Sequence, residues 1–318
     1  MSALYSIISH TPPFSWYCTD SQGESMQDEV AVVPGTTIDI IAPKRSLLVG
    51  SLQIIGKSNQ AVDPLEVYQE TQRIVQVWRK QGTADYLRYR KVSDPSEYNM
   101  QIVPFSRNTW GFWQQLKVLW NVTLGGTRTS QKSRESIVEA FKETETTLSS
   151  EDLPSSQPRE TPSRDDAFCM QSIIEKQWVF KGRFINILHD YAPIGLEKLH
   201  FLLVPKRHCE KLSDLTEEEY AEVEELSQKL IHFYKSKNHD QQDFAAHIFD
   251  KTGALAGQTV PHWHQHHVFT ITKIQGFWGK LTILKNMIFG SSPLKLEELN
   301  TKVEQLREDF KNLSEKTD

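Results

Sequence analysis

The stretch GQTVPHWHQHHVF, residues Gly257–Phe269, decides both the fold and the chemistry expected of this chain. Side chains along a strand alternate between two faces, so His262, His264 and His266 would share one face. Because Pro261 cannot donate a backbone hydrogen bond, we expect this strand to begin there or to lie where that position needs no amide partner. A row of three imidazoles predicts a functional site.

Three interpretations of this row of histidines are possible. A merely exposed polar strand is disfavoured, because aligned imidazoles repel one another when protonated. A zinc site is the second interpretation, for which His208 or His247 would supply a further ligand. We favour the third, in which a neutral imidazole attacks phosphorus while other imidazoles hold the oxygens. The preceding loop, 251–257, contains two glycines whose amides can approach a phosphate closely.

The motif resembles the histidine triad (HIT) superfamily of nucleotide hydrolases and transferases, whose signature is His-x-His-x-His followed by apolar residues. The lead-in Gly257–Val260 is similar to the family's Gly-Gln-Ser/Thr-Val. Upstream, Leu199–His208 is similar to the family's early strand, which ends in Pro-Lys-x-His. The resemblance covers about residues 184–270.

The resemblance implies a role for each of these residues. His264 would attack the α-phosphorus of a nucleotide and carry the nucleotidyl group, while His262 would orient the ring of His264. His266 and His208 would contact the phosphoryl oxygens or the leaving group. The remaining substrate-binding residues would be Gly257, Gln258, Thr259 and Lys251. The family commonly has asparagine near Lys251 and Thr252, and the implied mechanism needs no metal or cofactor.

The chain also reads as two related halves. Gly111-Phe-Trp recurs as Gly276-Phe-Trp, 165 residues later, and the segment from Leu52 resembles that from Leu202 at a spacing of 149. A capped helix is expected after each of these two segments, from Asp63 and from Thr216. We therefore expect a degenerate HIT-like domain at 1–142, a Ser/Pro/acidic linker at 143–166 and a catalytic HIT-like domain at 167–318.

The first half lacks the imidazoles that the mechanism needs. The two spacings give the first-half counterparts of His262, His264, His266 and His208 as Glu97, Asn99, Gln101 and Asn59. None of them can act as an imidazole nucleophile, so we expect one active site per chain.

Composition limits the class of protein. The 318 residues carry a net charge of −5, which argues against a protein that coats nucleic acid. Three cysteines without a CxxC pair argue against a disulfide framework. The sequence shows neither a secretory signal nor an apolar run long enough to span a membrane, so we expect a cytoplasmic protein. Ten of the 11 histidines follow residue 188, which places the chemistry late in the chain.

These features together predict an α+β fold of two HIT-like copies. Each copy would be a mainly antiparallel sheet with packed helices, and the pair would form a pseudo-dimer within one monomeric chain. The predicted function is a nucleotide phosphoester or phosphoramidate hydrolase that acts through a covalent nucleotidyl-histidine. Two alternatives remain: a nucleotidyltransferase or phosphorylase of the duplicated HIT type, and a non-catalytic nucleotide-binding interaction protein. A histidine at the third triad position, His266, favours the hydrolase.

Overall fold

The computed structural model describes residues 30–58, 60–94, 96–106, 111–148, 166–195, 197–237, 244–270, 286 and 291–314. Three sequence predictions lie outside these ranges: the role of Asn59, most of the linker (149–165) and the repeated Gly-Phe-Trp segment at 276–290.

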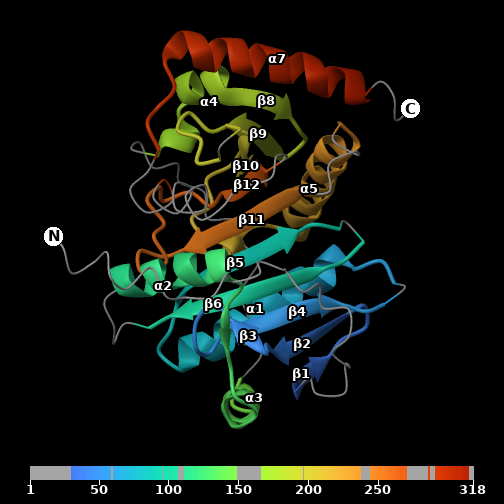
Figure 1. The fold of residues 1–318 in the computed structure, drawn as a ribbon, viewed down its shortest axis with the longest axis vertical. Coiled ribbons are helices and arrows are strands. Elements are labelled where there is room, and N and C mark those ends of the chain that lie inside the picture. Colours follow the sequence, from blue (N-terminus) through green and yellow to red (C-terminus); the bar gives the residue numbers. More distant parts are fainter. Residues whose placement is uncertain are drawn as a thin grey trace, which may run out of the picture.

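A single antiparallel sheet of ten strands forms the centre of the molecule (Figure 1), and the predicted α+β class is confirmed. In their order across the sheet, the strands are β1 (Val30–Pro34), β2 (Ile38–Ala42), β4 (Leu52–Gly56), β6 (Asn99–Phe105), β5 (Asp85–Val92), β11 (Ala245–Thr252), β12 (Gln265–Thr270), β10 (His200–Pro205), β9 (Ile185–His189) and β8 (Trp178–Lys181). A separate pair joins β3 (Arg45–Ser46) to β7 (Thr127–Arg128).

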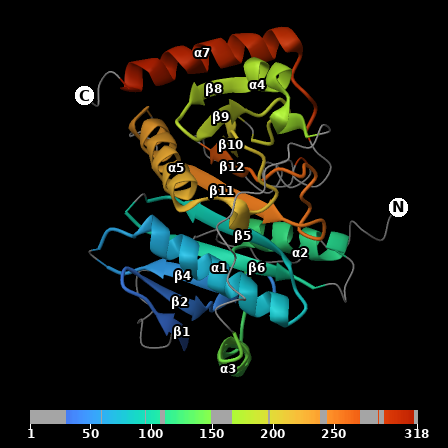
Figure 2. The same cartoon turned by 180° about the vertical axis from the view of Figure 1, so that it is seen from behind.

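Helices cover both faces of this sheet. The described helices are α1 (Pro64–Lys80), α2 (Gly111–Leu124), α3 (Gln131–Glu145), α4 (Gln171–Gln177), α5 (Glu217–Lys237) and α7 (Leu296–Ser314), with 3-10 turns at Ala167–Cys169 and Leu212–Asp214. Figures 1 and 2 show α1 and α5 on one face and α2 on the other. The tyrosine hydroxyl of Tyr68 on α1 donates to the carbonyl of Leu215, just before α5, at 2.6 Å. The two helices from the two halves therefore pack against each other.

Both predicted helix starts are confirmed. The Asp63 carboxylate accepts from the Leu65 amide at 2.9 Å, with Pro64 at the first position of α1. Before α5, the hydroxyl of Thr216 accepts from the Glu219 amide at 3.2 Å, and the Glu219 carboxylate accepts from the Thr216 amide at 2.8 Å. These bonds satisfy helix amides that would otherwise lack partners.

The same strand order occurs in each half. Counted inward from the edges, β1-β2-β4-β6-β5 has the same order along the chain as β8-β9-β10-β12-β11. The two inner strands, β5 and β11, pair antiparallel with Tyr89 opposite Phe249. The registers also correspond, because Leu202 of β10 faces His266 of β12 and Gln53 of β4 faces Gln101 of β6.

A hydrogen-bonded turn precedes the second strand of the first half. The Gly35 amide donates to the Ile38 carbonyl at 2.9 Å. Glu66 of α1 accepts from the amides of Thr36 and Thr37, the latter at 2.7 Å. The ammonium of Lys57 donates to the Gly35 carbonyl. The helix is thereby joined to the edge of the sheet.

The second half contains the corresponding turn. The Gly182 amide donates to the Ile185 carbonyl at 2.9 Å. Glu222 of α5 accepts from the amides of Arg183 and Phe184, each at 2.5 Å. Lys206 donates to the Gly182 carbonyl at 2.6 Å. The same residue types thus make the same contacts in both halves.

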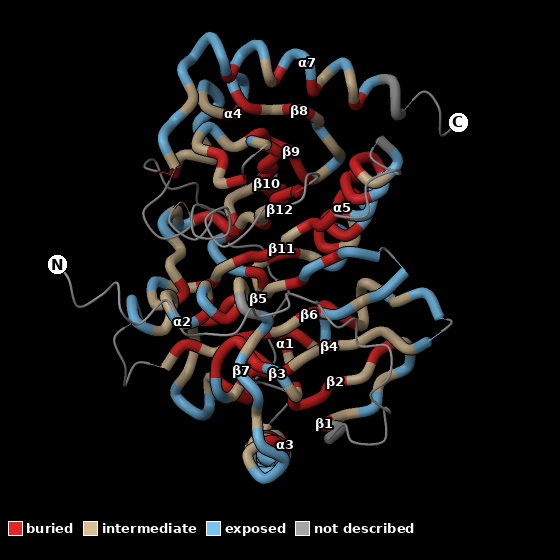
Figure 3. The backbone as a smooth tube through the Cα atoms, viewed as in Figure 1, coloured by how far each residue is buried: buried red, intermediate tan, exposed pale blue. Residues whose placement is uncertain are grey.

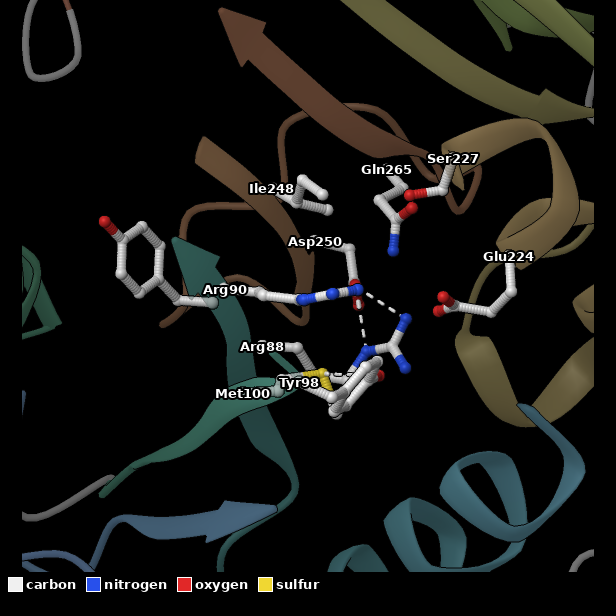
Figure 4. Close-up of a pocket in the computed structure, with 10 residues that line it drawn as sticks. Arg88, Arg90, Tyr98, Met100, Glu224, Ser227, Ile248, Asp250 and Gln265 are labelled. Atoms are coloured by element: carbon white, nitrogen blue, oxygen red, sulfur yellow. Dashed lines mark hydrogen bonds and ion pairs between the residues drawn. The ribbon is translucent and has the colours of Figure 1, made fainter. Parts of the chain in front are cut away.

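A buried ion pair joins the halves at the β5–β11 junction. The Arg88 guanidinium contacts the Asp250 carboxylate at 2.8 Å and 2.7 Å, and both side chains are 1% exposed. Figure 4 shows this pair beside Glu224 and Gln265. The other oxygen of Asp250 accepts from the Trp263 indole at 3.3 Å. A first-half arginine is therefore connected to the residue between His262 and His264.

Burial follows the sheet. Figure 3 shows buried residues along the central strands and exposed ones on the outer sides of α3 and α7. In the part of the chain that the structure describes, no helix combines the length and apolar character needed to span a bilayer.

Candidate active site

The triad segment leads into β12 rather than lying wholly within it. The strand begins at Gln265, so the expected start at Pro261 is wrong, and His262 and His264 lie before the first ladder residue. His262 is fully buried, whereas His264 and His266 are half-buried. This break in the ladder lets the carbonyl of His262 turn towards a neighbouring side chain.

That carbonyl fixes the orientation of His264. Nδ1 of His264 lies 2.8 Å from the carbonyl oxygen of His262. Because a carbonyl oxygen only accepts, Nδ1 carries the proton and Nε2 has the free lone pair. Burial lowers the pKa of His264 to about 4, although this hydrogen bond opposes the shift. His264 is therefore a neutral imidazole whose unprotonated nitrogen is Nε2.

His266 is held by a relay from β10. Its Nδ1 lies 2.9 Å from Nε2 of His200, and Nδ1 of His200 lies 3.1 Å from the Asp190 carboxylate. The rings of His266 and Phe249 stack at 4.5 Å, and the rings of His264 and His266 are 4.8 Å apart. Burial, together with the adjacent histidines, lowers the pKa of His266 well below its usual value. The relay orients His266 beside His264.

A second cluster forms around Asp166. Its Oδ2 atom lies 2.5 Å from Nδ1 of His262 and 2.9 Å from Nδ1 of His208, and it accepts from the Cys169 thiol at 3.0 Å. Burial alone would raise the pKa of Asp166, but the bonds from His262 and Cys169 hold it well below its usual value. The other nitrogen of His262, Nε2, lies 3.1 Å from the Pro205 carbonyl. Asp166 thus braces the histidine whose carbonyl orients His264.

The same four side chains form a donor set that fits a metal ion. Ligand atoms of Asp166, Cys169, His208 and His262 all lie within 4.8 Å of one another. Two nitrogens, one sulfur and one carboxylate oxygen suit zinc. The bond from Nε2 of His262 to the Pro205 carbonyl is the outer contact that a zinc-bound histidine usually makes. A metal here would hold His262 and leave His264 outside its ligands.

The structure brings only part of the predicted substrate set to the triad. His208 lies with its ring 5.3 Å from His262 and directs Nδ1 at Asp166. Gln258 holds the loop, because its side chain accepts from the Gly253 amide at 2.8 Å and donates to the Glu210 carbonyl at 2.9 Å. Thr259 is exposed. Direct contact of these three with substrate stays a prediction.

Lys251 and Gly257 lie at the two ends of the glycine loop. The ammonium of Lys251 lies 5.9 Å from the Phe249 ring, and burial lowers the pKa of Lys251. Lys251 also lines a pocket that includes Phe112 and Gln115 of α2. Gly257 adopts a φ of +83°, which favours glycine. Lys251 and His266 therefore both lie near the Phe249 ring, and contact of Lys251 with substrate stays a prediction.

Sequence reasoning missed Asp166, Cys169 and His200. Asp166 was assigned to the linker, and its contact with His262 spans 96 residues of chain. His200 had a signal, since the strand that ends in Pro205-Lys-x-His begins with it. The structure places linker residues 143–145 at the end of α3 and Asp166 in the site.

The first-half counterparts are used in structural hydrogen bonds. The side-chain amide of Gln101 donates through Nε2 to the Arg45 carbonyl at 2.9 Å and accepts through Oε1 from the Leu47 backbone amide at 3.1 Å. Asn99 accepts from the Gln53 side chain at 2.9 Å. Glu97 is exposed. Gln101 and Asn99 thus make first-half hydrogen bonds at two positions where the second half has imidazoles.

Comparison with known proteins identifies a HIT domain at residues 173–271. No match was found among curated proteins. The structure resembles that of diadenosine triphosphate hydrolase from Plasmodium falciparum, with 17% identity over 49% of this chain and 90% of that chain and a TM-score of 0.35. It also resembles ADP-glucose phosphorylase from Arabidopsis thaliana, with 12% identity, 86% and 82% coverage and a TM-score of 0.47. A GalT-like protein from Arabidopsis thaliana matches with 12% identity, 88% and 87% coverage and a TM-score of 0.46.

Proposed function

We propose that this protein is a HIT-type nucleotide hydrolase in which His264 is the nucleophile. The lone pair on Nε2 of His264 attacks the α-phosphorus of a nucleoside phosphate derivative, and the bond from phosphorus to the leaving group breaks. The leaving group takes a proton, and a nucleotidyl-histidine remains. The observation that carries this proposal is the bond from Nδ1 of His264 to the His262 carbonyl, because it fixes which nitrogen is free.

The same bond stabilises the intermediate. Once Nε2 is bonded to phosphorus, the imidazole carries positive charge. Its Nδ1–H then donates to the His262 carbonyl oxygen, which lies 2.8 Å from Nδ1. Water then attacks phosphorus from the side opposite Nε2, the N–P bond breaks, and a nucleoside monophosphate leaves. The water proton passes to solvent or to the neighbouring His266, and His264 returns to its neutral form.

The choice between water and another acceptor defines the alternative activity. A nucleotidyltransferase or phosphorylase would use the same His264 intermediate with a phosphate or sugar phosphate as acceptor. His266 at the third triad position favours water. Lys251 and Thr252, near the position where the family commonly has asparagine, support the other alternative, a protein that binds a nucleotide without turnover.

The test of this function is a panel of adenylyl and guanylyl substrates, each with a phosphate ester or phosphoramidate leaving group. We expect nucleoside monophosphate as product in water alone. Stimulation by inorganic phosphate or a sugar phosphate beyond the rate in water would assign transferase chemistry instead. Tight binding of nucleoside monophosphates without turnover of any substrate would leave only the binding protein.

We also propose that the two halves are copies of one domain, the first extending through Glu145 at the end of α3 and the second including Asp166. Two observations support this: the repeated strand order, and the two corresponding turns at Gly35 and Gly182, whose amides are bound by Glu66 and Glu222. In such a chain the first half takes the place of the second subunit of a dimer, so we expect a monomer. Light scattering that gives a mass near 36.7 kDa is the expected result, and twice that mass would contradict it.

We further propose that the Asp166 cluster binds one zinc ion with a structural role. Elemental analysis of protein purified without chelator should give one equivalent of zinc, and Cys169→Ala should reduce it. His232→Ala, a change at an exposed histidine on α5, is the matched control and should leave the zinc content unchanged. Protein that is metal-free and fully active would contradict zinc and leave His262 held by Asp166 and the Pro205 carbonyl.

A further inference from the structure

The glycine loop of the second half is built against side chains of the first half. Gly253 adopts a φ of +89°, and a Cβ atom there would lie 2.2 Å from the Asp85 carboxyl carbon. Gly257 adopts a φ of +83°, and a Cβ atom there would lie 3.2 Å from the Gln115 amide. Both glycines of the loop therefore have a first-half polar side chain next to them.

Those two side chains hold one residue of the loop from both sides. The amide of Leu255 donates to the Asp85 carboxylate at 2.8 Å. The carbonyl of Leu255 accepts from the Gln115 side chain, also at 2.8 Å. Asp85 begins β5 and Gln115 lies on α2, so two separate elements of the first half fix the backbone of this residue. We call Asp85, Gln115 and Leu255 the loop clamp.

Within the loop, the remaining bonds set its shape but not its place. The Gly257 amide donates to the Ala254 carbonyl at 3.0 Å, and the Gln258 amide donates to the Gly253 carbonyl at 3.2 Å. These contacts close the loop on itself, with the Gln258 side chain bonded to the Gly253 amide at 2.8 Å. The loop leaves β11 directly after Thr252, which is the last residue paired with β5. Its position relative to the triad is therefore set by Asp85 and Gln115 of the first half, together with the bond from the Gln258 side chain to the Glu210 carbonyl.

From this geometry we infer that Asp85 and Gln115 are positioning residues for the active site of the other half. The inference rests on the proposed function, in which the loop between Lys251 and Gln258 receives the substrate phosphate. A shift of about 1 Å in the groups that place a reacting atom can cost roughly 100-fold in rate. The first half, which lacks the imidazoles, thus contributes to catalysis by fixing the position of the glycine loop relative to His264.

The role assigned to the clamp differs from general stabilisation. Asp85 and Gln115 act on the loop through the backbone of one residue, Leu255, and neither contacts the triad histidines in the described structure. Their loss should loosen residues 251–259 while the ten-stranded sheet stays paired. We therefore expect a fall in kcat/KM with most of the loss in kcat, since the nucleoside would still bind while its α-phosphorus is misplaced.

The test combines amide hydrogen exchange with kinetics on the full-length protein. Asp85→Ala and Gln115→Ala should accelerate exchange in the peptide covering 251–259 and lower kcat/KM by about tenfold to 100-fold. Asp85→Asn keeps an oxygen acceptor for the Leu255 amide and should restore most of both properties. This conservative variant also serves if Asp85→Ala does not fold.

Matched controls come from the first half itself. Asp94 also accepts from a backbone amide, that of Ser96 at 2.9 Å, but lies just beyond the opposite end of β5. Gln81 also donates to a backbone carbonyl, that of Ala140 at 3.2 Å, at the end of α1. Asp94→Ala and Gln81→Ala should leave loop exchange and kinetics unchanged.

Two results would overturn the clamp. Unchanged exchange in the loop of Asp85→Ala and Gln115→Ala would show that the first half does not hold it. Faster exchange with unchanged kcat/KM would show that the contact has no catalytic consequence. The exchange measurement needs no substrate, so failure of the clamp can be told apart from failure of the proposed function, which would appear as absence of turnover in the unmodified protein.

Discussion

Where the second half holds His266, bonded to His200, the first half holds Gln101, bonded to the backbone of Arg45 and Leu47. The glycine turns at the two sheet edges, in contrast, use the same glutamate and lysine contacts. The framework contacts that the halves share are those that attach helix to strand. The contacts that differ lie at the triad positions, which shows that a sheet of this kind needs the framework but not the imidazoles.

The largest expected effect separates the two halves at the central triad position. His264→Ala should reduce kcat by about 1000-fold or more, because the nucleophile is lost. Asn99→Ala, at the corresponding position of β6, removes only the bond with Gln53 and should leave steady-state kinetics unchanged. Equal losses in both variants would contradict the assignment of one active site to the second half.

The next effect concerns the junction between the halves. Arg88→Met leaves the buried carboxylate of Asp250 without its cation, so we expect a loss of about 3–5 kcal/mol in the free energy of unfolding. Urea denaturation measures it. The double variant Arg88→Met with Asp250→Leu should recover much of the stability, because neither charge is then buried alone. A double variant as unstable as Arg88→Met would indicate that the loss of stability does not come from the unpaired charge of Asp250.

A buried histidine at the junction of the two inner strands should make the free energy of unfolding depend on pH. His247 of β11 bonds through Nδ1 with the Tyr89 hydroxyl at 2.9 Å, and burial, aided by Lys91, lowers its pKa to about 4. The unfolded chain takes up this proton near pH 6.5, so stability is present above that pH and is lost as the pH falls towards 4. The loss from this group is on the order of 3 kcal/mol.

The measurement is the free energy of unfolding between pH 4 and 8 for the unmodified protein and for His247→Leu. The variant should show a shallower slope, by up to about 1.4 kcal/mol per pH unit in the acid range. His232→Leu, at an exposed position of α5, is the control and should keep the original slope. An unchanged slope in His247→Leu would show that this histidine does not titrate with unfolding.

The smallest effect tests the likeness of the halves. Glu66→Gln and Glu222→Gln each weaken the charged acceptor of one glycine turn, so each should cost about 1–2 kcal/mol. The two losses should agree within about a factor of two in thermal unfolding experiments. A clear loss in one variant and none in the other would contradict equivalent roles for the two turns.

The sequence predicted what depends on local pattern. The caps at Asp63 and Thr216 and the α+β class are set by residues close together in the chain. The single strand face predicted for His262, His264 and His266 stays a prediction, because His262 and His264 lie before β12. The start of the triad strand was placed four residues too early, because Pro261 indicates only where a ladder bond is missing.

What the sequence did not predict depends on contacts between distant segments. Asp166 lies in a stretch of serine, proline and charged residues, where one buried carboxylate cannot be told from solvated neighbours. The loop clamp joins Asp85 to Leu255 across 170 residues. Neither contact leaves a periodic signal, because the first arises only when the second half folds and the second only when the sheet brings the halves together.

The central claim is that one half alone carries the chemistry, through His264. Its most direct test is intact-protein mass spectrometry after rapid mixing with substrate and acid quenching, followed by peptide mapping of the adduct. The account predicts one nucleotidyl group per chain, on the peptide that contains His264, and none in the His264→Ala variant. Turnover without an adduct, or an adduct on a first-half peptide, would contradict it.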